Sequence, residues 1–144
     1  MRNLTPAPGQ TIVYNGGCID GFAEGPGRTR WYVDGKLSSI YKGDYRRGRR
    51  HGQGVYLFPD GSRYSGGFVN GQRHGRGVRT WPNGDRFEGG FRNGRRDGPG
   101  VIDYADGQRY EGPYADGKPH GDGTCYTPAR GTWPCRWEHG KLIR

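Results

Sequence analysis

A histidine lies between arginines on a glycine-rich backbone at residues 73–77, Arg73-His74-Gly75-Arg76-Gly77. Arginine binds phosphate through paired hydrogen bonds, and glycine lets the backbone approach an anion closely, so these residue types could form a phosphate loop. A catalytic loop normally occurs once in a chain. Together with His74, related tetrads begin at His51, Asp97 and His120, and each starts 23 residues after the one before. A fixed period indicates a structural repeat rather than a single site.

The repeat covers more than this tetrad. An aromatic residue opens each copy, and a second aromatic residue follows four positions later. The opening residues are Tyr41, Tyr64, Phe87, Tyr110 and Trp133, and the second residues are Tyr45, Phe68, Phe91, Tyr114 and Trp137. We divide the chain, as one continuous domain, into an N-terminal segment (1–13), a degenerate first repeat with an insertion (14–40), four regular repeats (41–63, 64–86, 87–109 and 110–132) and a truncated C-terminal capping repeat (133–144).

Each regular repeat contains two turn signals. The first is a two-residue pair such as Asn70-Gly71, which favours a primed hairpin turn. The second is a three-residue stretch such as Pro59-Asp60-Gly61, which keeps the aromatic side chains on one face through the turn. Direct register about the first turn places Tyr64 opposite Gly77, so that a side chain at Gly75 or Gly77 would collide with the ring. We therefore predict an all-β fold, an elongated, twisted, single-layer antiparallel meander of repeated β-hairpins.

Composition agrees with a thin aromatic core. Aromatic residues make up 13% of the 144 residues and fall largely on the repeat positions, so each copy can bury a small aromatic cluster against its neighbours. There is no signal-peptide-like apolar run and no stretch long enough to span a bilayer, so we expect a cytoplasmic protein, with a peripheral position at a membrane as an option. The three cysteines lack CxxC spacing and favour reduced thiols, although Cys125 and Cys135 could form a disulfide in an oxidising compartment.

Neither a metal site nor a catalytic site emerges from these motifs. His51, His74 and His120 occupy one repeat position, so neighbouring rings would lie about 9 to 10 Å apart, too far to converge on one zinc ion. We expect each ring instead to be hydrogen-bonded at the start of the second strand. The Gly-x-Gly pairs lack a third glycine with a following helix, and no nucleophile, base and orienting group recur at a distinctive spacing. We therefore expect no enzyme activity, no cofactor and no metal.

The pattern Tyr-x-Gly-x-Tyr/Phe-x-x-Gly-x-x-His-Gly-x-Gly, with a 23-residue period, resembles the MORN repeat (membrane occupation and recognition nexus). The resemblance covers about residues 41 to 126 in full register, with weaker copies at 14 to 35 and 133 to 140. Departures are Asp97 for the usual histidine, Cys18 for an aromatic residue and Cys135 for a glycine. The resemblance implies a peptide-receptor groove that can take an amphipathic helix, and it implies anionic phospholipids as further ligands.

The first candidate surface is the aromatic face, because a partly exposed apolar stripe on a single-layer sheet usually marks an interaction site. We predict that it binds a protein or an amphipathic peptide. The residues assigned to it are Tyr41, Tyr45, Tyr64, Phe68, Phe87, Phe91, Tyr110 and Tyr114.

The second candidate surface is an arginine-rich edge formed by the first turns. The net charge is +9, and 13 of the 23 lysines and arginines fall in residues 41–96. The edge residues are Arg46, Arg47, Arg49, Arg50, Arg73, Arg76, Arg92, Arg95 and Arg96. Arginine suits bidentate phosphate recognition, so the edge either assists an acidic partner or binds anionic phospholipid membranes, and a solvated edge without a ligand is the plain alternative.

Two further interactions follow from charge and topology. Charge alone would suffice for nonspecific nucleic-acid binding, but the sequence contains no known nucleic-acid module, so we do not favour that partner. The end strands, near Gly16 and the Lys36–Ile40 insertion and again from Trp133 to Arg144, offer a route to a homodimer.

Overall fold

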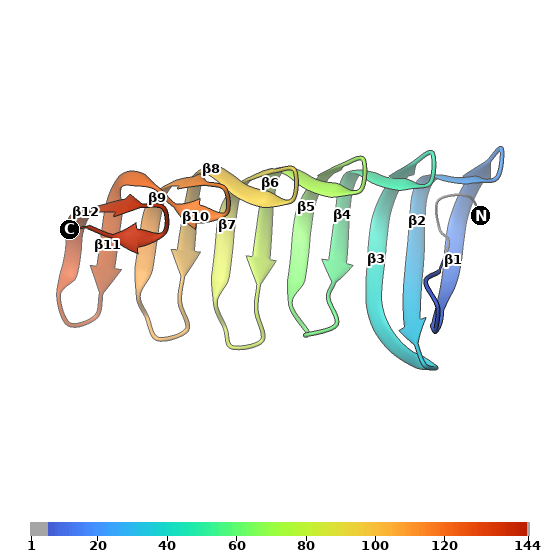
Figure 1. Ribbon diagram of the computed structural model, residues 1–144, viewed down its shortest axis with the longest axis horizontal. Helices are drawn as coiled ribbons and strands as arrows, with labels where there is room; N and C mark the ends of the chain where they lie inside the picture. Colours follow the sequence, from blue (N-terminus) through green and yellow to red (C-terminus); the bar gives the residue numbers. More distant parts are fainter. Residues whose placement is uncertain (1–5, 144) are drawn as a thin grey trace. The chain divides into compact units, whose positions relative to one another are not determined.

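The structure is a computed structural model that describes residues 6–143. Every regular element in that range is a β-strand, and the same residues contain no helix long and apolar enough to cross a membrane. One compact unit ends at Gln72 and a second begins at Arg73. Within each unit, strands that follow one another in the chain pair antiparallel (Figure 1). The predicted all-β meander of hairpins is confirmed.

The strands of the first unit are β1 (Gln10–Ile19), β2 (Phe22–Val33), β3 (Lys36–Arg46), β4 (Arg49–Leu57) and β5 (Arg63–Val69). Strand β6 (Gln72–Thr80) begins at the boundary. The remaining strands are β7 (Arg86–Arg92), β8 (Arg95–Asp103), β9 (Arg109–Ala115), β10 (Lys118–Pro119), β11 (Gly121–Thr127), β12 (Gly131–Glu138) and β13 (Lys141–Leu142). Strand β9 pairs with both β10 and β11, and β12 pairs with both β11 and β13.

Both predicted turn types are present. At the first turn two successive residues have positive φ, as in Asn93 (50°) and Gly94 (83°), which a primed two-residue turn requires. Arg47 adopts the same conformation, with φ of 47°, although arginine is not a favoured residue there. The second turn of the first unit holds the predicted three-residue loop: the Phe58 amide donates to the Ser62 carbonyl (2.9 Å), and the loop ends in left-handed Gly61 (φ 89°).

The direct register predicted for Tyr64 and Gly77 is wrong in the equivalent hairpins within each unit. Tyr41 pairs with Tyr56, not with glycine, and Phe87 pairs with Ile102. The cause is a bulge, since the register shifts by two residues between the first turn and the rest of each hairpin.

The bulge gives the two glycines of each tetrad separate roles. Gly52 lies in the bulge with φ of 82°, a conformation that strains any other residue. Gly54 lies under the opening ring, where an added Cβ would collide with Tyr41. The proposed collision at Gly75 is also wrong: an added Cβ would meet nothing within 4 Å there, and glycine is required by its φ of 82°.

Edge-to-face aromatic contacts form the core of each unit. The Tyr41 ring contacts Tyr45 of its own repeat and Phe68 of the next, with centroids 5.1 and 5.2 Å away. In the second unit Phe87 contacts Phe91 and Tyr114 in the same way, at 5.4 and 5.0 Å. These T-shaped arrangements match the preference of the aromatic quadrupole. Each opening ring therefore joins two successive repeats.

The cysteine prediction is corrected for one pair. Cys125 and Cys135 form a disulfide between β11 and β12, with Cα atoms 5.8 Å apart. They lie diagonally rather than opposite, because Cys125 pairs with Trp133 and Cys135 with Gly123. Both side chains point to the buried face, at 5% and 4% exposure, so the fold itself brings the sulfurs together. The prediction of reduced thiols gives the redox compartment more weight than the geometry of the two strands.

Candidate binding surfaces

The eight aromatic residues predicted to bind a partner form the buried core. None of them is more than 4% exposed. The core residues are Tyr41, Tyr45, Tyr64, Phe68, Phe87, Phe91, Tyr110 and Tyr114. A molecule lying on this face of the sheet would therefore meet the side chains that surround these rings, not the rings themselves.

Several core tyrosines also use their hydroxyl groups internally. The hydroxyls of Tyr41, Tyr64 and Tyr110 donate to backbone carbonyls three residues later, at 2.8, 2.8 and 3.0 Å. In Tyr41 the acceptor, Asp44, lies in the bulge, so this bond fixes the irregular part of the strand. The hydroxyls of Thr29 and Tyr45 are hydrogen-bonded to each other. Burial raises the pKa of Tyr45 to about 12, and that hydrogen bond offsets part of the rise.

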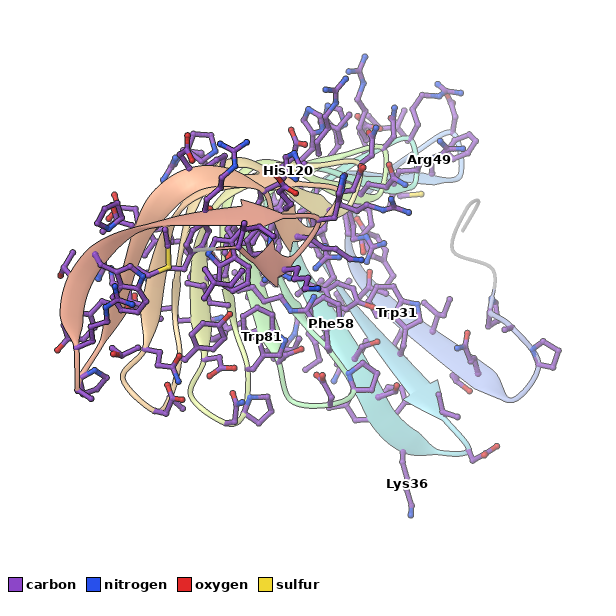
Figure 2. All side chains as sticks on the ribbon, turned by 60° about the vertical axis from the view of Figure 1, so that its left-hand side comes forward. Trp31, Lys36, Arg49, Phe58, Trp81 and His120 are labelled. Carbon is purple, nitrogen blue, oxygen red and sulfur yellow. A yellow bond between two sulfur atoms is a disulfide. The ribbon has the colours of Figure 1, made fainter. Side chains whose placement is uncertain are left out.

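A second set of aromatic residues supplies the surface of this face in the first unit. Tyr56 pairs with both Tyr41 and Tyr64, so its side chain lies on the same face as the core. Its ring centroid lies 5.8 Å from that of Trp31 and 4.7 Å from that of Phe58. Trp31 and Phe58 are labelled in Figure 2. All three of these side chains are partly exposed. We call Trp31, Tyr56 and Phe58 the first-unit aromatic cluster.

In the second unit the same face contains a cavity of about 420 Å³, the C-terminal aromatic pocket. Its apolar lining comes from Tyr104, Tyr110, Trp133, Trp137 and Leu142, with the Cys125 sulfur beside them. The indole N–H groups of Trp133 and Trp137 are buried and have no acceptor among residues 6–143. A buried donor without a partner costs about 1–3 kcal/mol, so the two indole N–H groups carry a local energetic cost in the fold.

Three of the nine predicted edge arginines are committed to the fold. Arg50, Arg73 and Arg96 each donate from Nη2 to the carbonyl of a turn glycine 21 residues later, at 2.9, 2.6 and 2.8 Å. The guanidinium groups also lie over core rings; that of Arg50 is 4.9 Å from the Tyr56 centroid. We call these three residues the arginine clamps. Their charge is directed into the sheet and is less available to an external anion.

The other six edge arginines are exposed. Arg46 and Arg49 pair directly across β3 and β4, and Arg92 and Arg95 pair directly across β7 and β8. Like charges placed opposite one another destabilise a sheet, so these pairs need a reason other than folding. Figure 2 shows Arg49 at the end of the first unit that carries the first turns, away from Lys36 at the opposite end of its hairpins.

The environments of the exposed arginines differ. Arg47 lies with its guanidinium 5.0 Å from the Phe22 centroid. Arg92 and Arg95 border a depression of about 450 Å³ that also contains Asp97 and Asp116, whose carboxylates offset their charge. Arg76 is exposed on β6.

A family comparison accounts for this periodic arrangement. The MORN repeat matches four consecutive segments of the chain, residues 41–63, 64–86, 87–109 and 110–132. The chain belongs to the MORN-repeat family. MORN repeats are generally modules of protein and membrane interaction, and the family is a non-enzymatic scaffold. No curated protein matches the chain.

Two histidines of the MORN repeats accept hydrogen bonds from backbone amides, which agrees with the prediction that rings at this repeat position are hydrogen-bonded. Nδ1 of His51 accepts from the Asn70 amide (3.5 Å), and Nδ1 of His120 accepts from the His139 amide (3.0 Å). Glu24 has the role of the histidine ahead of the first matched repeat: its carboxylate accepts a hydrogen bond from the Arg47 amide at 2.8 Å. Among residues 6–143 no three potential ligands converge in a way that could hold a metal ion.

One aromatic column of the MORN repeats was not among the predicted site residues. Phe58, Trp81 and Tyr104 precede the second turn in successive copies and share the 23-residue period. Each is partly exposed, whereas the opening aromatics of the four matched repeats are buried. Trp81 lies beside Arg79, whose guanidinium is 5.2 Å from its ring centroid. The 23-residue period of this third column could have located the exposed rings of the face from the sequence. These rings matter because a binding surface needs side chains that remain accessible.

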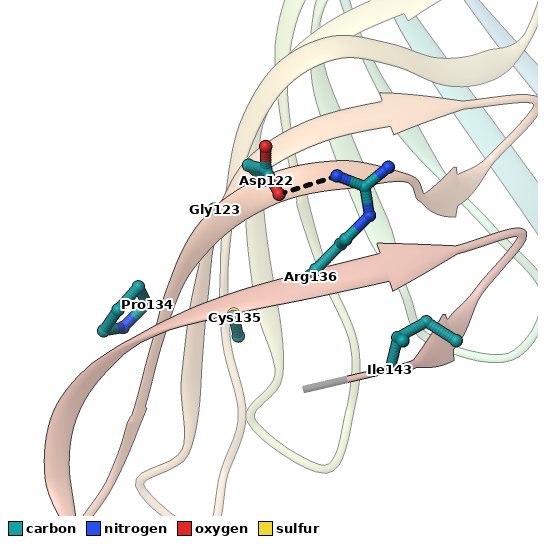
Figure 3. Close-up of a pocket in the computed structure, with 6 residues that line it drawn as sticks. All are labelled: Asp122, Gly123, Pro134, Cys135, Arg136 and Ile143. Carbon is teal, nitrogen blue, oxygen red and sulfur yellow. Dashed lines mark hydrogen bonds and ion pairs between the residues drawn. The ribbon is translucent and has the colours of Figure 1, made fainter.

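A second cavity, of about 630 Å³, has six lining residues, four of which lie beyond the last segment matched by the MORN repeat. Figure 3 shows Arg136 directed at Asp122, and their ion pair measures 3.2 Å. Glu138 also contacts Arg136, at 3.7 Å. Since these carboxylates neutralise the guanidinium, and Pro134 and Ile143 form the apolar walls, this cavity offers no unpaired charge to a ligand.

Proposed function

We propose that this protein is a non-catalytic scaffold that binds a protein segment along the aromatic face of its MORN-repeat sheet, with the exposed arginines assisting an acidic partner. The observation that carries the proposal is the C-terminal aromatic pocket, a cavity of about 420 Å³ whose lining is dominated by aromatic side chains. A peptide supplies apolar side chains that can fill such a pocket. The core aromatics act indirectly, by holding the exposed rings in place.

The proposal fits peptide recognition better than binding of a small polar ligand. The pocket lining is mainly aromatic and aliphatic, and tryptophan and tyrosine dominate the energetics of protein interfaces. An amphipathic segment would place apolar side chains against Leu142 and the rings, while its polar groups meet Asp106, Gln108 and Arg109, which also line the pocket. The first-unit aromatic cluster offers a platform of the same chemistry on its own unit.

Selection of peptides from a displayed library against the whole protein tests this function. The double variant Trp133→Phe, Trp137→Phe makes two of the rings that line the pocket smaller, so we expect selected peptides to bind at least about tenfold more weakly, because a few large aromatic side chains dominate interface energetics. Trp81→Phe is the matched control, because Trp81 lies outside the pocket lining. Near-ultraviolet circular dichroism checks that each variant is folded. Equal binding by the double variant would contradict the role of the pocket.

A second candidate function is binding to anionic phospholipid membranes through the exposed arginines. The cross-strand pair Arg46–Arg49 favours it, because it concentrates two charges at the cost of mutual repulsion. Flotation with anionic and neutral vesicles at physiological salt is the test. Arg46→Glu with Arg49→Glu should release the protein, whereas the charge-matched variant Lys36→Glu with Lys141→Glu should not. Retention of the first variant would reject this candidate.

The proposed location depends on the Cys125–Cys135 pair. Persistent disulfides favour an oxidising compartment, which argues against the cytoplasmic location predicted from the lack of a signal-peptide-like or bilayer-spanning stretch. Thiol labelling of the protein as isolated from cells measures this directly. Labelling of Cys18 alone would support an oxidising location, and labelling of all three cysteines would support the cytoplasm, with or without a peripheral membrane position.

A further inference from the structure

The face of the first unit that lies opposite the aromatic core is unusually basic. Successive residues of a strand point to opposite faces, so the residues between the core positions form this outer face. One row across the paired strands is Val13, Arg30, Ile40, Leu57 and Arg63. The adjacent row is Asn15, Arg28, Lys42, Val55 and Ser65. We call Arg28, Arg30, Lys42 and Arg63 the outer basic face.

The cations of the outer basic face form no ion pair within residues 6–143. The two rows contain no carboxylate; the next row holds one, Asp44, opposite Pro26. Arg28 lies directly opposite Lys42, a like-charge pair that destabilises the sheet. The Nε of Arg30 is buried and lacks a hydrogen-bond acceptor among the described residues. The face therefore carries an electrostatic cost in the isolated chain.

The second unit shows that the fold does not require this excess. The corresponding rows there contain Glu88, Asp103 and Glu111 as well as arginines. Arg86 pairs with Glu88 at 3.1 Å, and Arg109 pairs with Asp103 at 3.3 Å. The same repeat architecture thus accommodates acidic residues at these positions. Their absence from the first unit is a property of that unit alone.

We propose that the outer basic face binds an acidic amphipathic segment of another protein. Ile40, Val55 and Leu57 lie between the cations, so a complementary partner must offer aliphatic side chains as well as carboxylates. From Arg30 on β2 to Arg63 on β5 there are three strand spacings, or about 14 Å. Carboxylates on one face of a helix, eight or eleven residues apart, are separated by about 12 or 16.5 Å along its axis, which brackets that distance.

The same chemistry argues against two other polyanions. The two rows contain no aromatic ring on which bases could stack, so a single-stranded nucleic acid would gain only its phosphate contacts. A membrane-inserting face normally projects large apolar side chains, whereas Ile40 and Val55 are half-buried and Leu57 is 38% exposed. This surface is separate from the aromatic face, which lies on the other side of the sheet.

Fluorescence anisotropy of a labelled peptide with Glu and Leu at helical spacing tests the proposal on the full chain. The variant Arg28→Gln, Lys42→Gln should bind at least about tenfold more weakly, and binding to the unchanged protein should fall with salt. This variant also relieves a like-charge pair, so its melting temperature should be equal or higher, which separates lost binding from lost folding. Arg86→Gln with Arg109→Gln is the control on the equivalent face of the second unit.

Each outcome decides the proposal. Loss of peptide binding in Arg28→Gln, Lys42→Gln alone, with Trp133→Phe, Trp137→Phe unaffected, supports it and separates it from the function proposed for the aromatic face. Equal binding by all variants overturns it. Tighter binding of this face to phosphatidylserine vesicles or to single-stranded oligothymidylate than to the peptide also overturns it, and names the alternative ligand class.

Discussion

Replacing Arg50 by methionine keeps most of the side-chain stem but removes an arginine clamp. The guanidinium donates to the Gly71 carbonyl at 2.9 Å and lies 4.9 Å and 5.6 Å from the centroids of Tyr56 and Phe68. A hydrogen bond to a charged group contributes about 1.5–3 kcal/mol, and each partly exposed cation–π contact about 0.5–1 kcal/mol. Since the side chain is only half-buried, we expect the free energy of unfolding to fall by about 2–4 kcal/mol.

Urea denaturation followed by tryptophan fluorescence measures this change. Arg49→Met is the matched control, because Arg49 is the neighbouring residue, carries the same charge and is exposed. An exposed substitution away from specific contacts usually changes the free energy of unfolding by no more than about 0.5 kcal/mol. A loss below that level for Arg50→Met, or equal losses for both variants, would refute the assignment of Arg50 to the fold and restore it as a candidate anion ligand.

Three further perturbations follow from the core. Tyr64→Phe removes the hydroxyl that donates to the Gly67 carbonyl (2.8 Å), so thermal unfolding should show a loss of about 1–2 kcal/mol; no loss would mean that the bond is replaced by water. The pKa of Tyr45 is raised to about 12. The neutral phenol therefore stabilises the folded state fully below pH 10, and the free energy of unfolding should fall by up to about 3 kcal/mol between pH 10 and 12. Unfolding followed by circular dichroism at several pH values in that range measures this loss of stability. If a Tyr45→Phe variant lost the same stability over the range, Tyr45 would not be its cause. Reduction of Cys125–Cys135, separated by 10 residues, should lower the free energy of unfolding by about 2–3 kcal/mol, with a reductant-insensitive double serine variant as the control.

Much of the fold could be predicted because local turn chemistry and the repeat agree. Asn93-Gly94 specifies a primed turn, and left-handed Gly61 ends the three-residue loop as expected. The register could not be predicted in the same way, since the bulge opposite Asp44 depends on tertiary contacts. Tyr41 fills the space above Gly54 and binds the Asp44 carbonyl only after the shift has occurred.

The binding surfaces were harder to infer because sequence spacing alone does not report exposure. Arg49 and Arg50 are adjacent and chemically identical, but one is solvent-exposed and the other is clamped against core rings. Tyr41 and Tyr56 are paired on one face, yet only Tyr56 remains partly exposed. Which ring lies beneath and which lies above depends on side-chain packing across strands. The sequence predicted one aromatic face. The aromatic residues that it assigned to partner binding are the buried ones.

The arginine clamps have a direction along the chain, and this matters during synthesis. Each clamp precedes its acceptor carbonyl by 21 residues, as Arg50 precedes Gly71. At a translation rate of about 5–20 residues per second, the acceptor leaves the peptidyl-transferase centre about one to four seconds after the arginine. A nascent hairpin therefore emerges from the ribosome with its clamp open and closes only when the following turn appears. Assembly of the sheet should trail elongation by one repeat, so a ribosome that stalls within a repeat leaves the preceding hairpin unlocked.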